Sequence, residues 1–118
     1  MAQQRLGSHF GAVTVFDGVG ASTGAPSAAD DTIYLTDRGD EYTGKVRCYL
    51  NYTGTVTSGN LLVHGYDGDA FYLLATEALT PASDEVIDVE VGNGAKIAFE
   101  IGSLVVSGGT VTLKVEQI

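Results

Sequence analysis

The stretch that decides the fold class is residues 86–118, VIDVEVGNGAKIAFEIGSLVVSGGTVTLKVEQI. Its apolar residues recur at every second position, which is the period of a β-strand with one buried face and one wet face. Two glycine-rich stretches, 92–94 and 107–109, predict tight reversals of the chain. The strands predicted between these reversals form a meander over 86–91, 96–101, 104–106 and 110–118.

The same alternation continues toward the N-terminus, with no helical periodicity. It predicts longer strands at 45–51, 60–66 and 70–76, and shorter ones at 10–16 and 33–36. Asp67-Gly68-Asp69 predicts a hairpin between two of them. About eight strands in all predict an all-β fold, a two-sheet antiparallel sandwich of the jelly-roll type. The sequence lacks the paired cysteines and core tryptophan of an immunoglobulin domain.

The chain of 118 residues fits one domain, and we expect the β-sandwich to occupy residues 10–118. Residues 1–9 are polar and do not alternate, which predicts an N-terminal arm. Residues 18–30 are rich in Gly, Ala and Ser and predict a long loop. Neither a secretory signal nor a bilayer-spanning apolar run is present, so we expect synthesis in the cytoplasm and no membrane partner.

The formal net charge is −9, with 15 acidic and six scattered basic residues. Such a surface repels phosphate groups, so we expect no nucleic-acid partner. Solubility is the simplest interpretation of this charge. A basic partner surface, divalent cations and a salty habitat are the alternatives.

The residues that could catalyse a reaction are few and dispersed. Nucleophilic catalysis needs a nucleophile, an adjacent base and an orienting group. Cys48 alternates with Val46 and Leu50, which places it in the predicted core, while His64 lies in a predicted strand and His9 in the polar start. We therefore expect a protein that is not an enzyme.

Acidic residues at the end of the predicted strand 33–36 are the candidates for a metal site. Asp37, Asp40 and Glu41 offer the carboxylate oxygens that Ca²⁺ prefers. Their spacing matches no EF-hand loop, and aspartates also stabilise turns through local hydrogen bonds. Calcium stays open as a ligand, and no other cofactor is expected.

Interface residues are predicted from the aromatic side chains and from the sheet edges. Tyr49 lies on the face opposite Val46 and Leu50, and tyrosine suits interfaces because it joins an apolar ring to a polar tip. The final strand, 110–118, is predicted to be a poorly protected sheet edge, which favours a homo-oligomer. The residues predicted to contact a partner are Arg5, His9, Tyr49, Lys114 and Ile118.

Over about its full length the chain resembles the small accessory virion proteins of tailed phages, above all the capsid decoration (cement) proteins. The resemblance rests on the polar start Met1–His9, the Gly/Ala/Ser-rich stretch Gly18–Asp30, and strands that continue to Thr110–Ile118. The absence of paired cysteines, a signal peptide and catalytic residues adds to it.

The resemblance implies a virion structural protein that binds capsid-shell proteins as a symmetric oligomer, with a trimer favoured, and lays its N-terminal arm on a neighbour. Two alternatives stay open. One is a carbohydrate- or receptor-binding module, because sandwiches and jelly rolls commonly carry sugar sites. The other is a tail or connector subunit of the virion.

Overall fold

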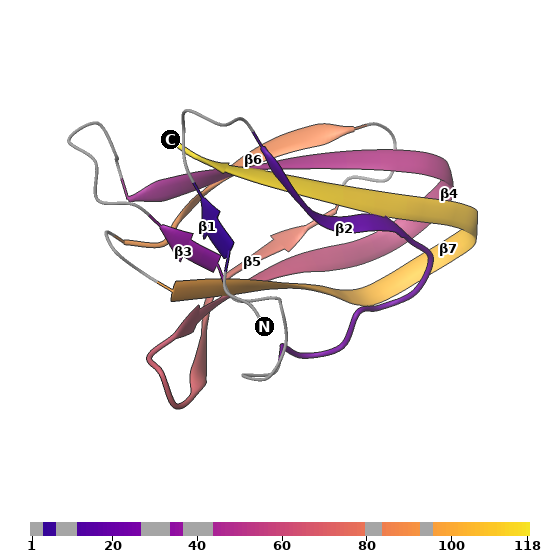
Figure 1. The fold of residues 1–118 in the computed structure, drawn as a ribbon. Helices are drawn as coiled ribbons and strands as arrows, with labels where there is room; N and C mark the ends of the chain where they lie inside the picture. Colours follow the sequence, from indigo (N-terminus) through magenta and orange to yellow (C-terminus); the bar gives the residue numbers. More distant parts are fainter. Residues whose placement is uncertain (1–3, 7–11, 27–33, 37–43, 80–83, 93–95) are drawn as a thin grey trace.

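The computed structural model describes residues 4–6, 12–26, 34–36, 44–79, 84–92 and 96–118, and all its regular elements are strands (Figure 1). The strands are β1 (Gln4–Leu6), β2 (Val13–Val19), β3 (Tyr34–Thr36), β4 (Lys45–Tyr66), β5 (Phe71–Ala78), β6 (Glu85–Glu90) and β7 (Lys96–Gln117). The predicted all-β class is therefore confirmed. Within the described ranges there are seven strands, where the sequence predicted about eight.

Two long strands form the centre of the fold. β4 and β7 have 22 residues each and pair antiparallel from Val46 with Gln117 to Tyr66 with Lys96. Figure 1 shows both strands curving round together at one end of the molecule, so that the two halves of each strand lie in opposite layers. The pairing register shifts at several points between Thr55 and Asn60, where the strands bend.

The remaining strands extend these two layers. In the β2/β6 layer, β6 pairs with residues 45–50 of β4, and β2 pairs with residues 111–115 of β7. In the β3/β5 layer, β5 pairs with residues 60–66 of β4, and β3 pairs with the start of β7. β1 pairs with β3 and is parallel to it, whereas the other pairings are antiparallel.

Three predictions about the end of the chain are wrong. The reversal predicted at 107–109 does not occur, because β7 runs through these residues as one strand. The predicted meander is absent, because β6 pairs with β4. The final strand is not an edge, because residues 111–115 pair with β2 on one side and with β4 on the other. Hydrogen bonds between strands connect all seven into one sheet.

The predicted hairpin at Asp67-Gly68-Asp69 is confirmed. It joins β4 to β5, and Gly68 has a φ of 101°, in the region that favours glycine. The Asp67 carboxylate accepts hydrogen bonds from the backbone N–H groups of Asp69 (2.7 Å) and Ala70 (2.8 Å). These bonds, that from Ala70 first, hold the pKa of Asp67 below its ordinary value.

The core lies between the layers and follows the predicted alternation. Its largest fully buried side chains all come from β4 and β7: Phe99, Leu50, Leu61, Ile97, Ile101, Leu113, Val46, Val63, Val111 and Val115. Side chains at every second position point inward, and the bend brings the inward faces of the two halves together. The long strands therefore supply both sides of one core.

The segment predicted as a loop is partly fixed to β7. The Thr23 N–H donates to the Ile101 carbonyl (2.9 Å), and the Thr23 hydroxyl accepts from the Ile101 N–H (3.0 Å). The Ser22 hydroxyl accepts from the Leu104 N–H (3.0 Å). Residues 18 and 19 belong to β2, and 27–30 lie outside the described residues. In the predicted arm, β1 is paired with β3.

Glycines allow the close approach of β4 and β7 at the bend. A Cβ atom added at Gly109 would lie under 3.0 Å from backbone atoms of Thr55, and one added at Gly54 would meet the backbone of Gly108 and Gly109. Gly108 itself has a φ of 67° but no atom within 4 Å of a Cβ position. Gly109 is thus required by contact, and Gly108 only by its backbone conformation.

We predict that Gly109→Ala lowers the free energy of unfolding by about 3 kcal/mol, because the added methyl group meets backbone that cannot rotate away. Gly108→Ala is the matched control, and it should cost about 1 kcal/mol for its positive φ alone. Urea unfolding followed by circular dichroism measures both. Equal losses for the two variants would contradict the close approach at the bend.

Candidate functional site

The outward face of the β2/β6 layer carries side chains that the pairing register sets in a row. Tyr49 on β4 lies between its partners Val86 on β6 and Lys114 on β7, and Lys114 in turn pairs with Thr14 on β2. Paired residues of antiparallel strands point to the same side of a sheet. One row therefore crosses all four strands and joins two predicted interface residues, Tyr49 and Lys114.

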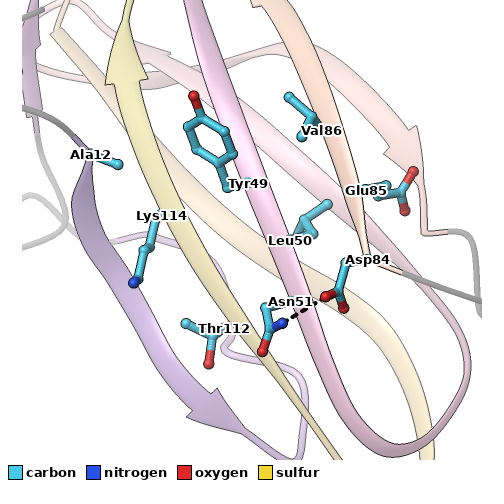
Figure 2. Close-up of a pocket in the computed structure, with 9 residues that line it drawn as sticks. All are labelled: Ala12, Tyr49, Leu50, Asn51, Asp84, Glu85, Val86, Thr112 and Lys114. Atoms are coloured by element: carbon cyan, nitrogen blue, oxygen red, sulfur yellow. Dashed lines mark hydrogen bonds between the residues drawn. The ribbon is translucent and has the colours of Figure 1, made fainter.

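A groove lies over this row (Figure 2). Its volume is about 710 Å³, within the range of small-molecule sites. Figure 2 shows the β6 residues along one wall, Lys114 and Thr112 along the other, and Tyr49 with Asn51 between them. The residues that line the groove are Ala12, Tyr49, Leu50, Asn51, Asp84, Glu85, Val86, Thr112 and Lys114.

Hydrogen bonds to Asp84 and Glu85 attach the β6 wall to β4. The Asp84 carboxylate accepts from the Asn51 side-chain amide and from the Tyr52 backbone N–H, both at 2.8 Å. The Tyr52 hydroxyl donates to the Glu85 carboxylate (2.6 Å). Because both acidic residues are bonded to β4, this wall of the groove is held in a defined position.

The ring of Tyr49 is held by its own hydroxyl group. That hydroxyl donates to the carboxylate of Glu116 on β7, and this hydrogen bond is the main reason why the pKa of Tyr49 is raised.

The next row of paired residues on this face contains an ion pair between β4 and β6. Arg47 contacts Asp88 through Nε (2.8 Å) and Nη2 (3.1 Å), and it lowers the pKa of Asp88.

Lys114 differs from Arg47 in its surroundings. The positive charge of Arg47 is neutralised by Asp88. Because the two side chains are 39% and 41% exposed, this ion pair contributes little to stability. Lys114 is exposed, and its side-chain amine has no hydrogen bond or ion pair with any residue that the structure describes. It is the cationic group of the groove and is available to a ligand.

Among the other predicted site residues, Ile118 is described in full and does not line this groove. Ile118 follows β7 and donates its backbone N–H to the Lys45 carbonyl (3.2 Å), and Arg5 lies in β1. His9, Asp37, Asp40 and Glu41 lie outside the described residues. Asn51 could have been predicted, because it shares an outward face with Tyr49, but Asp84 and Val86 join the site only through the β4–β6 register.

The nucleophile and the base considered in the sequence lie apart in the fold. Cys48 is in the core, where burial raises the pKa of its thiol to about 12. His64 is in the β3/β5 half of β4, and its Nε2 lies 3.0 Å from the Glu100 carboxylate. Among the described residues, no group of three or more His, Cys, Asp and Glu side chains could hold a metal ion.

A second surface feature is the outer edge of β5. β5 ends the sheet order, and no other described strand pairs with its outer side. Tyr72, Leu73 and Leu74 are 59%, 57% and 43% exposed, next to a register shift opposite Val63 and His64. We call these three residues the β5 edge. The sole charged residue of the strand is Glu77.

Comparisons of this chain with protein-family models, with curated proteins and with solved structures return no match. In the part of the chain that the structure describes, no helix is long and apolar enough to cross a membrane.

We predict that the Cys48 thiol of the folded protein does not react with a water-soluble disulfide reagent near pH 8. The thiol is buried and protonated there, and the thiolate is the reactive species. The same reagent should label one thiol per chain after unfolding in urea. Rapid labelling without denaturant would show that β4 opens readily and would contradict the packed core.

Proposed function

We propose that this protein is a non-enzymatic structural component of a virion, a capsid decoration (cement) or minor capsid subunit that stabilises a viral shell through protein–protein contacts. The virion setting comes from the family resemblance, which also implies production in the host cytoplasm and capsid proteins as partners. The observation that carries the assembly role is the β5 edge, with its three exposed large apolar side chains.

The outer side of β5, an apolar edge strand, is the surface of the described structure that most favours contact with a partner. Its outer backbone N–H and C=O groups can hydrogen-bond to a strand of another subunit, and natural proteins usually protect such edges with charges, prolines or a covering segment. β5 contains no lysine and no proline. Contact with another subunit would remove Tyr72, Leu73 and Leu74 from water, which is favourable.

The same surface supports the proposed homo-oligomer. The edge first expected at residues 110–118 is covered by β2, and β5 takes its place as an available edge. Closed symmetric assemblies are the usual form of homo-oligomers, and the resemblance favours a trimer. We also propose a jelly-roll-like sandwich as the fold type, which is supported by the two layers and by the bent strands shared between them.

A second candidate function is a carbohydrate- or receptor-binding module. The groove favours it, because an aromatic ring, an exposed valine and several polar groups converge there. A tail or connector subunit would use the β5 edge in the same way as a decoration protein. The groove and the β5 edge involve different residues, so the two functions can be tested separately.

We predict that Leu73→Lys abolishes self-association and incorporation into the parent particle, because a charge would be desolvated in the contact. Val105→Lys is the matched control, since Val105 is 53% exposed and lies outside both surfaces. Light scattering at physiological and high salt measures the mass, because the charge of −9 opposes association at low salt. Normal assembly and incorporation of Leu73→Lys would refute the role of the β5 edge.

A further inference from the structure

We propose that the groove over Tyr49 binds a neutral saccharide, with one sugar ring lying across β4 between Val86 and Lys114. This inference develops the second candidate function and does not depend on the β5 edge. The fixed shape of the groove, its apolar surface, its hydrogen-bonding groups and the charge around it support this ligand class.

The groove is built in advance on four strands. The lining residues come from or adjoin these strands: Ala12 precedes β2, Tyr49 and Asn51 belong to β4, Asp84 precedes β6, Val86 lies near its start, and Thr112 and Lys114 belong to β7. Two strand spacings, about 10 Å, separate β6 from β7. The hydrogen bonds between Asp84 and β4 hold the β6 wall of the groove in place, and the hydrogen bond from Tyr49 to Glu116 holds the tyrosine ring. A ligand would therefore meet a surface that needs little ordering on binding.

The apolar surface suits the C–H face of a sugar ring. Val86 is 57% exposed although it is a large apolar residue, and it flanks the half-buried ring of Tyr49. Placing a sugar ring over these two side chains would remove apolar surface from water on both partners. Tyrosine provides this contact area at low cost in conformational entropy, because its side chain has few rotatable bonds.

The polar groups complement sugar hydroxyls, which both donate and accept hydrogen bonds. A carboxylate has about four acceptor positions. Asp84 uses two of them for Asn51 and Tyr52, so its carboxylate can still accept from a hydroxyl. Across the groove, the amine of Lys114 can donate to another hydroxyl. An acceptor on one wall and a donor on the other would set the orientation of the ring.

The charge around the groove selects for a neutral ligand. Asp84, Glu85 and Glu116 lie in or beside it, against Lys114, while the nearby Arg47 is paired with Asp88, and the whole chain carries a net charge of −9. Anionic saccharides and phosphate groups are repelled by such a surface. We therefore expect neutral hexose-containing glycans to bind and sialylated, uronic-acid-containing or sulfated glycans not to bind.

The test is a glycan array that carries neutral and acidic glycans, probed with the full chain and followed by titration of the best ligand. Val86→Asp should weaken binding at least tenfold, because it puts a charge against the sugar face. Val105→Asp is the matched control and should bind as the wild type does. Tyr49→Phe keeps the ring and should retain most of the affinity, whereas Tyr49→Ala should lose it. Urea unfolding of each variant checks that it is folded.

Three results would overturn the proposal: no neutral glycan bound by the wild type, binding that Val86→Asp leaves intact, or binding confined to acidic glycans or to peptides. Self-association of the same variants, measured by light scattering, tests the assembly role separately. Val86→Asp should self-associate as the wild type does, while Leu73→Lys should still bind the glycan. A failed array with normal assembly would remove the saccharide site and leave the structural role untouched.

Discussion

The continuous pairing of β4 with β7 is the constraint on which the rest of the structure depends. Both strands bend at the same place, and they can do so while paired because glycine leaves room for backbone against backbone at Gly54 and Gly109. The bend creates the two layers, encloses the core and leaves four side positions for the shorter strands. β2 and β6 occupy two of these positions, and their contact with the central pair forms the walls of the groove.

Local periodicity predicted most of the strands and many of the buried side chains, but it missed β1 and residues 52–59, which join the two predicted strands 45–51 and 60–66 into β4. The alternation of Ile97, Phe99 and Ile101 with polar neighbours predicted their burial, and all three are buried. The pattern could not distinguish a reversal from a bend, because both need glycine, and so Ser107-Gly108-Gly109 was taken for a turn. The alternation also could not predict which strands pair with each other, because a strand with one buried face has the same pattern at an edge and at the centre of a sheet.

The candidate site was predicted in pieces and assembled only by the fold. Tyr49 and Lys114 were each predicted as outward-facing interface residues, and the register sets them side by side. No sequence pattern marked Asp84 and Val86 as site residues. They reach the groove only because β6 pairs with β4, although β5 lies between these two strands in the sequence. The exposed apolar residues of β5 were missed because alternation there predicted a strand but not the register shift beside Leu73 and Leu74.

The nested pairing of β4 and β7 also bears on how the chain is made. On the ribosome, residues 96–117 emerge after the six other strands, so β4 stays without its main partner until then. The inner pair, Tyr66 with Lys96, can form first, and pairing can then proceed outward through the bend to Val46 and Gln117. Such non-local sheets fold slowly. The nascent chain therefore exposes the apolar face of β4 from the emergence of residues 45–66 until residues 96–117 follow, and cooperative folding has to wait for that strand.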